Sequence, residues 1–558
     1  MSASSKKKLR KEQAAAAMTE KQLAQQKEAK KLKIYSTIFV AVLALIVVAA
    51  LVVGSINVVN NSGILQKSTD AVVIGDTTLS NADLNFFYID QIQRDYNEWY
   101  SSYGNSTQLF VQWFMGLDIT KPLNQQVYNA ETGETFADYY EDKAIAAAKE
   151  VYAIYNLAKA AGVTLTEAQQ NELDLTFSSL ESYAAMAGYS NTDAYLKAMY
   201  GTGATIKNYR HYLEVSTIAT NYAQNYYNGL EVSDADIEAR NNESYDEFST
   251  FDYAVFFVDM NAFLPCLSEN VASDHQHTVA EYAAARKAAE EAANTIVASG
   301  ATDTEMLDAA IANIEAYKLL SETDSKSSVR TDYALDEVTE DQAQWLSAEG
   351  RQVGDLGLLT KKVTSTDADG LETTTIDGYY IMLFMGRNDF EEKLVNVRHI
   401  LVSFTGGTTD ENGNKTYSEE EKKAAKDAIE AIQTEWLAQG GTEDAFIALA
   451  KEKSTDNGTK ADGGLCEEVY PGQMVQNFND WCFAEGREAG NYGIVETQYG
   501  YHLIYFVNQT DIVYRDTLIE QTLINERYTE WYEAQLEATT VTEKNTKYLS
   551  KDYIIAGY

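Results

Sequence analysis

An internal repeat in the second half of the chain limits the folds that this sequence can adopt. The thirteen residues from Trp345 (WLSAEGRQVGDLG) and the thirteen from Trp481 (WCFAEGREAGNYG) share seven identities at an offset of 136 residues. In each copy an apolar strand and a long charged helix precede this motif, and a strand that opens with Gly-Tyr follows it. These segments are FDYAVFFV (251–258), 279–298 and GYYIMLFM (378–385) in the first copy, and VRHILVSF (397–404), 418–439 and GYHLIYFV (500–507) in the second. The sequence therefore predicts two tandem copies of one β-α-β unit.

The length of the chain leaves room for further domains. At 558 residues it is too long for one hydrophobic core, and a prior of about 150 residues per domain suggests three or four. Its 38 tyrosines and ordinary apolar content indicate that most of it folds. Three cysteines are too few and too scattered for a disulfide framework or a zinc site, and whether Cys466 and Cys482 are bonded stays open at this point.

Charge is distributed unevenly along the chain. Residues 1–33 hold ten Lys or Arg and three Glu, residues 34–55 hold no charge, and the remainder has a net charge near −47. An uncharged apolar stretch of this length can cross about 30 Å of hydrocarbon as a helix. The positive-inside rule then predicts a cytoplasmic segment over 1–33, a single-pass transmembrane signal anchor in the cell membrane over 34–55, and an extracytoplasmic bulk. A cleaved signal peptide is the alternative, but its A-x-A-like site is not visible.

The acidity of the bulk excludes one class of partner. A surface with this net charge repels the phosphate backbone, so no nucleic acid is expected to bind. The basic run at the N-terminus is better explained by membrane topology and by anionic lipid headgroups. The expected contact with the membrane is therefore through the N-terminal helix.

Helical patterns dominate residues 57–245. A short strand and turn at 71–76 precede Ser80, the expected N-cap of a helix. The other helices expected in this region are 143–161, 166–187, 192–200 and 206–227. Their tyrosines either pack in the core, which is favoured, or form a groove for client chains. Residues 511–558 contain another apolar helical stripe, at 517–539, which needs a partner.

Parts of this region resemble extracytoplasmic foldases of the PrsA and SurA kind. The resemblance rests on the strand-turn-helix opening, on TDAYLKAMYGTGATIKNYRHYLE (192–214) and on EVSDADIEARNNESYDEF (231–248). These are matches of apolar pattern within residues 70–250. They imply a helical chaperone-like region over 57–245, with the helix and tail of 511–558 packed back on it.

The second copy of the repeat resembles the parvulin (rotamase, PpiC) family over residues 391–510. Four motifs stand in the family's order and spacing: VRHILV (397–402), STDNGTKADGG (454–464), PGQMVQNF (471–478) and YGYHLI (499–504). The resemblance implies a four-stranded antiparallel sheet wrapped by helices. It also implies prolyl isomerase activity.

The resemblance assigns seven residues to the site. The catalytic positions, two sheet histidines and a central Cys-or-Asp, fall on His399, His502 and Asp456. The substrate-binding positions, two in an apolar pocket for proline and two at its rim, fall on Met474, Phe478, Cys466 and Thr497. Two departures leave the substrate preference open. The family's Gly-Gly-Asp-Leu-Gly is replaced by GGLCE (463–467), and Tyr499 stands where some relatives have a small hydroxyl side chain.

Prolyl isomerisation explains why residues of these types suffice. Rotation about an X-Pro bond meets a barrier of about 18–20 kcal/mol but breaks no bond, so it requires no nucleophile, no cofactor and no metal. A dry pocket that grips the proline ring and prefers the twisted, less polar amide lowers that barrier. Met474 and Phe478 suit the grip. The histidines with Asp456 are expected to hold one tautomeric arrangement without transferring a proton.

The first copy, residues 246–390, is predicted to be a degenerate parvulin-like domain. Aligning its two strands with those of the second copy puts Tyr253 at the place of His399 and Tyr380 at the place of His502. A phenol cannot reproduce an imidazole network at neutral pH. An insertion, VTSTDADGLETTT (363–375), is expected to lengthen a surface loop. A peptide-binding role and a role as a rigid arm stay equally open.

The expected fold class is multidomain α+β, with a transmembrane helix, a helical chaperone-like region, two parvulin-like units and a C-terminal helix. The expected function is a peptidyl-prolyl cis-trans isomerase that acts on X-Pro segments of unfolded or partly folded exported polypeptides, at the outer face of the cell membrane. The alternative is a holdase or assembly chaperone in which both parvulin-like units only bind peptide.

Overall fold

The computed structural model of the chain describes residues 63–264, 277–317, 326–366, 372–410, 413 and 415–555. The expected cytoplasmic segment and membrane span, 1–33 and 34–55, lie outside these residues. Across the described ranges no helix is both long and apolar enough to cross a membrane. The described residues form two compact units, 63–231 with 522–555, and 232–521. The expectation of a multidomain α+β chain with a helical region is confirmed.

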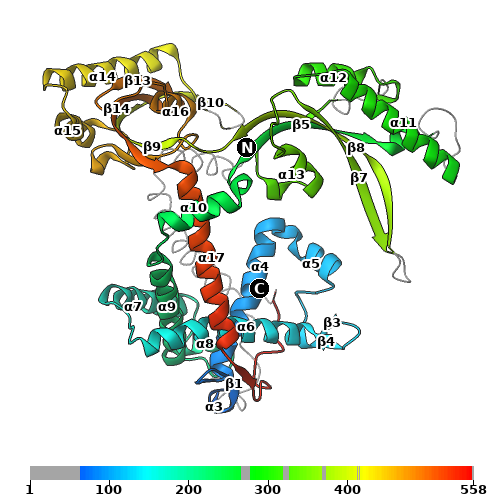
Figure 1. Cartoon of the computed structure of the whole chain (residues 1–558). Helices are drawn as coiled ribbons and strands as arrows, with labels where there is room; N and C mark the ends of the chain where they lie inside the picture. The colour runs from blue at the N-terminus through cyan, green and yellow to red at the C-terminus, as the bar shows by residue number, and fades with distance from the viewer. Residues whose placement is uncertain are drawn as a thin grey trace. The chain divides into compact units, whose positions relative to one another are not determined.

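The first unit is mostly helical (Figure 1). Its elements are α3 (Ile64–Ser68), β1 (Asp70–Ile74), β2 (Thr77–Ser80), α4 (Asn81–Tyr103), α5 (Thr107–Met115), β3 (Val127–Asn129), β4 (Glu134–Thr135), α6 (Phe136–Ala160), α7 (Glu167–Met186), α8 (Thr192–Tyr200), α9 (Ile206–Asn228), β15 (Val541–Glu543) and most of α17 (Tyr514–Ala538). In its small sheet, β1 pairs antiparallel with both β2 and β15. The sheet therefore joins segments from the two ends of the described chain.

Capping boxes begin several of these helices. Before α4, the Ser80 hydroxyl accepts a hydrogen bond from the Asp83 N–H, and the Asp83 carboxylate accepts one from the Ser80 N–H. The same reciprocal arrangement begins α6, α7 and α9. Each box satisfies donors that the start of a helix leaves unpaired. The predicted N-cap at Ser80 is confirmed, and α7, α8 and α9 begin within one residue of their predicted starts. The start expected at 143 was wrong, because α6 begins at Phe136, directly after its N-cap Thr135.

The aromatic residues of this unit pack largely in its core. The ring of Phe86, on α4, lies within 5.3 Å, centroid to centroid, of those of Tyr200, Tyr209 and Tyr212. The predicted helix near the C-terminus is α17, and its Trp531 stacks on Tyr226 of α9 at 3.9 Å. Core packing, the favoured interpretation of the tyrosines, is therefore confirmed for this cluster.

The second unit contains two four-stranded antiparallel sheets of equivalent strand order, β6-β5-β8-β7 and β12-β9-β14-β13. Its elements are α10 (Asp234–Glu243), β5 (Thr250–Asp259), α11 (Val279–Ala298), α12 (Thr304–Ala312), β6 (Ser328–Tyr333), α13 (Glu340–Leu346), β7 (Leu356–Thr366), β8 (Glu372–Asn388), β9 (Lys393–Ser403), β10 (Thr408–Thr409), β11 (Lys415–Thr416), α14 (Glu419–Ala438), α15 (Glu443–Lys453), β12 (Leu465–Val469), α16 (Gln476–Cys482), β13 (Tyr492–Thr497) and β14 (Gly500–Val513). Apolar residues of α11 pack on one face of the first sheet, and those of α14 and α15 pack on the second. The predicted repeat is confirmed as two copies of one fold.

The repeated Trp and Arg make the same contact in both sheets. The guanidinium of Arg351 stacks on Trp345, 4.0 Å from the ring centroid, and its Nε donates to the Trp345 carbonyl at 3.0 Å. Arg487 stacks on Trp481 at 3.9 Å and donates to its carbonyl at 2.9 Å. A cation over an indole face is attracted by the ring quadrupole. The identities that reveal the repeat therefore preserve the scaffold.

The last glycine of each motif lies against the same tryptophan. A Cβ added to Gly357 would lie 2.2 Å from the nearest ring atom of Trp345, and one added to Gly493 would lie 2.4 Å from Nε1 of Trp481. Such distances are too short for any carbon, so β7 and β13 require glycine where the indole packs on them.

The described parts of the insertion, 363–366 and 372–375, form strands and not the surface loop that we expected. The first part continues β7 and the second continues β8, with Thr364 paired to Thr374 and their hydroxyl oxygens 2.9 Å apart. Valine and threonine are β-branched and favour extended backbone. Their run therefore lengthens the β7–β8 hairpin, which projects beyond the rest of its sheet (Figure 1).

We predict that Gly357→Ala and Gly493→Ala each destabilise the second unit by about 1–3 kcal/mol, because the new methyl group overlaps the indole. The free energy of urea unfolding, followed by tryptophan fluorescence, measures the effect. Gly386→Ala, in β8, is the matched control, since its Cβ would lie 3.5 Å from the nearest atom. Equal stability of all three variants would show that the glycines do not constrain the fold.

Candidate active site

Two histidines meet at the centre of the second sheet because of the register of its central strands. His399 lies on β9 opposite Ile504, and His502 lies on β14 opposite Leu401, so the histidines are diagonal neighbours on one face. Their Nδ1 atoms are 3.0 Å apart, and both side chains are buried. The strand pairing alone therefore brings together two residues that are 103 positions apart.

Polar side chains from loops extend this pair into a hydrogen-bonded row. The Nε2 atom of His399 lies 3.0 Å from Oδ2 of Asp456 and 3.0 Å from the hydroxyl oxygen of Thr459. The Thr459 hydroxyl itself donates to the Asp456 carboxylate. At the other end, the hydroxyl oxygen of Thr497 lies 3.0 Å from Nε2 of His502. The row runs from Asp456 through both imidazoles to Thr497.

The environment gives the two histidines opposite charge states. Burial disfavours a charged imidazole at His399, but the hydrogen bond to the Asp456 carboxylate and the adjacent Cys466 sulfur outweigh it, and the pKa of His399 rises to about 10. Burial, together with the charge on His399, lowers the pKa of His502 well below its usual value. Burial also opposes ionisation of Asp456, yet its hydrogen bond to His399 and the charge there hold the pKa of this carboxyl well below its usual range. At neutral pH the pair therefore carries one positive charge, next to one carboxylate.

This charge distribution determines the hydrogen positions. Charged His399 donates from Nε2 to Asp456 and from Nδ1 to Nδ1 of His502. Neutral His502 then keeps its hydrogen on Nε2 and donates to Thr497, whose hydroxyl in turn donates to the Gly500 carbonyl at 3.3 Å. Every polar atom of the row has a partner, so the site is held in one tautomeric arrangement.

An apolar cavity lies beside the histidine pair. It has a volume of about 20 Å³, and the residues that line it are His399, Cys466, Met474, Val475, Phe478, Tyr499 and His502. The Phe478 ring meets both imidazoles edge-on, at 5.5 and 5.3 Å between centroids. Space of this size holds about one water molecule. A group the size of a five-membered ring therefore enters only after a lining side chain moves, and the unbranched Met474 is the most adaptable of these side chains.

The structure places all seven predicted residues at this site. Five of them line the cavity, and the other two, Asp456 and Thr497, bond to the ends of the histidine pair. Thr497, which we expected at the rim of the pocket, reaches the site through His502. Cys466 and Cys482, whose bonding the sequence left open, are both free and buried.

Sequence reasoning missed two participants. Thr459 is fully buried, and it follows Asp456 by three residues, a spacing that brings its hydroxyl back to the carboxylate. That turn, DNGT, is visible in the sequence and could have indicated the contact. Val475 carries no such signal, because it differs little from any other apolar residue. Within the described ranges, no group of three or more His, Cys, Asp or Glu side chains is placed to hold a metal ion.

The first sheet has no imidazole at the corresponding positions, although one of the two predicted matches was wrong. Counted from the Gly-Tyr start of the last strand, Tyr380 corresponds to His502, as expected. Counted through the strand pairing, Val255 and not Tyr253 occupies the place of His399. The apolar alternation of a strand has a period of two, so a shift of two residues fits the sequence pattern equally well.

Comparisons with known proteins show which family and which proteins this part of the chain is similar to. Residues 379–510 match the family model of the PPIC-type PPIase domain. The chain is 32% identical to foldase protein PrsA 1 of Listeria monocytogenes over 154 residues, which is 28% of this chain and 41% of that protein. It is 29% identical to PrsA 2 of the same species over 198 residues, 35% of this chain and 52% of that protein. This chain thus spans about half, or less, of the length of these relatives.

Among solved structures, the chain is similar to a peptidylprolyl isomerase (PrsA) from Bacillus anthracis. That match has 22% identity and a TM-score of 0.17, and it covers 27% of this chain and 59% of the other. The family match begins at residue 379, within β8 of the first sheet. The first strand of the second sheet, β9, begins only at Lys393. The parvulin resemblance noted in the sequence is confirmed for the second sheet and its helices.

The two histidine pKa values predict a stability maximum. His399 has a folded pKa of about 10, above the unfolded value near 6.5, so its contribution is complete below pH 6.5 and is lost as pH rises toward 10. The folded pKa of His502 is depressed, so its contribution is complete above pH 6.5 and is lost as pH falls. We expect the stability difference between the wild-type chain and His399→Gln/His502→Gln to peak near pH 6.5, with limiting slopes of about 1.4 kcal/mol per pH unit.

Hydrogen exchange at the β9 and β14 amides, in urea between pH 5 and 9, measures this difference. His211→Gln, which changes an exposed histidine of the other unit, is the control. A difference that rises or falls steadily across the whole range would contradict the assignment of one shared charge.

Proposed function

We propose that the chain, which carries a PPIC-type PPIase domain at 379–510, is a peptidyl-prolyl cis-trans isomerase that assists the folding of exported polypeptides. The observation that carries the proposal is the apolar cavity against the buried histidine pair. The names of the relatives, foldase protein PrsA 1 and PrsA 2, support the same activity. The substrates would be X-Pro segments of unfolded or partly folded chains.

The site can lower the barrier to rotation without forming or breaking a bond. Met474 and Phe478 supply an apolar surface for the proline ring, and both are buried. A twisted amide loses conjugation, and its carbonyl becomes less polar, so a dry site favours it over the planar ground state. Each 1.4 kcal/mol of such preference raises the rate about tenfold.

The histidine row keeps this surface rigid. Because His399 and His502 use both ring nitrogens within the row, neither has a hydrogen left to give to the substrate. Their rings pack edge-on against Phe478 and so hold the wall of the pocket in place. We therefore assign them a positioning role and leave proton transfer out of the mechanism.

A holdase is the second candidate function, and one surface favours it. Residues 100–117, at the end of α4 and along α5, contain no charged side chain. Within them Leu109, Trp113 and Phe114 are 72%, 87% and 73% exposed. Exposed apolar groups of this size are typical of surfaces that bind other chains.

We also propose that residues 34–55 anchor the chain in the cell membrane with residues 1–33 inside. The charge-free run and its basic flank support this topology. It would place both units outside the cytoplasm, where exported polypeptides emerge unfolded.

For the activity, we predict that the purified 558-residue chain accelerates cis–trans exchange in a short X-Pro peptide, and that Phe478→Ala lowers kcat/KM roughly ten- to hundredfold by removing about 1.5–3 kcal/mol of pocket contact. Exchange spectroscopy by NMR measures the rate. Phe478→Leu, which keeps an apolar side chain, should lose less. Gln476→Ala, at an exposed position of α16, is the control.

The same assay separates the alternatives. A wild-type chain without activity that still suppresses aggregation of an unfolded protein would favour the holdase. Full activity in Phe478→Ala would place catalysis outside the second sheet, and the first parvulin-like unit would then have to be tested.

For the topology, we predict that protease added to intact cells degrades residues 63–558 and spares a tag placed before residue 1. Immunoblotting for tags at both ends follows the digestion. Digestion of the N-terminal tag from outside would refute the proposed orientation, and lysed cells provide the control in which both tags are lost.

A further inference from the structure

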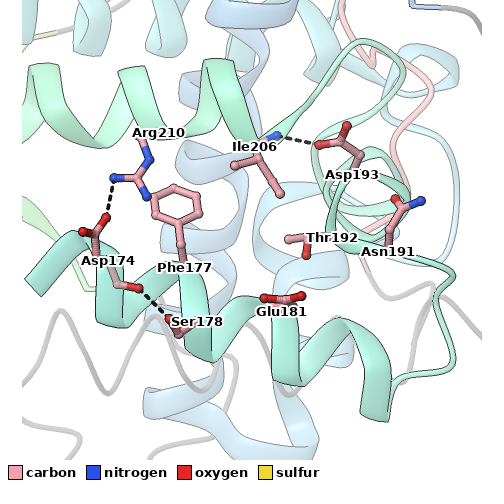
Figure 2. Close-up of a pocket in the computed structure, with 9 residues that line it drawn as sticks. All are labelled: Asp174, Phe177, Ser178, Glu181, Asn191, Thr192, Asp193, Ile206 and Arg210. Carbon is pink, nitrogen blue, oxygen red and sulfur yellow. Dashed lines mark hydrogen bonds and ion pairs between the residues drawn. The ribbon is translucent and has the colours of Figure 1, made fainter. Parts of the chain in front are cut away.

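A second cavity belongs to the helical unit, whereas the candidate isomerase site belongs to the other unit. The second cavity has a volume of about 480 Å³ and lies between α7, the start of α8 and the start of α9 (Figure 2). Its lining residues are Asp174, Phe177, Ser178, Glu181, Asn191, Thr192, Asp193, Ile206 and Arg210. A volume of this size is within the range of ligand-binding pockets.

Two of its three carboxylates are already used by the fold. Asp174 forms an ion pair with Arg210 at 2.9 Å, and the Arg210 guanidinium lies over the Phe177 ring at 4.4 Å. Asp193 accepts a hydrogen bond from the Ile206 N–H at 2.7 Å, and so caps the start of α9. These contacts join the three helices that form the cavity, and they need no ligand.

Two polar side chains of the lining, Glu181 and Thr192, make no such contact. Glu181 is exposed, and its carboxylate has no hydrogen bond or ion pair with any residue that the structure describes. Thr192 is only 5% exposed, yet its hydroxyl, which faces the cavity, also has no partner among the described residues. The Thr192 oxygen is not among the fully buried polar atoms that lack a partner, so it meets the solvent of the cavity. It is therefore free to form a hydrogen bond with a molecule that enters the cavity.

The charge of the cavity indicates the kind of molecule. Asp174, Glu181 and Asp193 outnumber Arg210 by two charges, so an anion is repelled and a cation is attracted. An ammonium or guanidinium group can donate to the Glu181 carboxylate and to the Thr192 hydroxyl at once. The methylene stem of such a side chain would lie on Ile206 and on the edge of Phe177.

We propose that this cavity binds the Lys or Arg side chain of an extended polypeptide client. The inference rests on the proposed function, which supplies the client. It adds a preference for basic side chains, which the apolar proline pocket cannot provide. Two other side chains of α7, Leu175 and Met186, are apolar and well exposed, and they offer apolar surface on the same helix to other residues of the client. Client segments that contain both basic and apolar residues would then bind to the helical unit, and X-Pro segments would bind to the other unit.

Fluorescence anisotropy with the purified 558-residue chain tests the proposal. The probe is a labelled, unstructured peptide of Ser, Leu and two Lys, without proline, and its partner probe has Gln at both Lys positions. We expect at least threefold tighter binding of the Lys peptide at low salt, with the preference shrinking at 0.5 M NaCl because salt screens exposed charge. We expect Glu181→Gln and Thr192→Val each to weaken binding of the Lys peptide at least threefold.

Glu172→Gln, two and a half turns before Glu181 on α7 and outside the cavity, is the matched control and should bind like wild type. Equal binding of both peptides by the wild-type chain would overturn the proposal, and so would equal loss in Glu172→Gln and Glu181→Gln. The isomerase rate of the wild-type chain, on an X-Pro peptide without basic residues, is measured in the same preparation. Absence of that rate with Glu181-dependent binding intact would remove the proposed function and leave the cation site standing.

Discussion

The pairing of β9 with β14 is the constraint on which the candidate site depends. It places two histidines as diagonal neighbours on a buried face, where two full charges would be prohibitively costly. Asp456 stabilises the charge on His399, and that charge keeps His502 neutral. The pair can therefore remain buried with a single hydrogen between its Nδ1 atoms. The edge-on packing of Phe478, and with it the pocket wall, follows from the fixed orientation of these rings.

The two sheets share the contacts that stabilise their fold and differ in the residues of the candidate site. Both keep the Arg-on-Trp contact and the glycine beneath the indole, with nearly identical distances. Only the second keeps the imidazoles, while the first has Val255 and Tyr380 at those places. A sheet of this kind thus retains its fold when its polar row is replaced by apolar and phenolic side chains, because the row is not what holds the strands together.

The helical unit is built by a different rule. Its helices are specified locally, by capping boxes such as Ser80 with Asp83 and by aromatic positions that become the core. Its surface is left with two unlike features, the uncharged aromatic end around Trp113 and the acidic cavity around Glu181. Both are features that a polypeptide client with apolar and basic residues can use.

The sequence by itself determined the repeat and the starts of α7, α8 and α9, because each depends on local pattern or on spacing. The family resemblance, through the spacing of its motifs, selected seven residues that the structure brings together in the second sheet, and their roles stay a prediction. The sequence also placed the caps and the strand alternation correctly, because these depend on local pattern. Only the tertiary structure decided which residues meet across strands. The alternation of β5 is unchanged by a shift of two, so Val255 could not be told from Tyr253. The pairing of 363–366 with 372–375, and the meeting of Glu181 with Thr192 at one cavity, also depend on contacts between segments, which no single-residue pattern records.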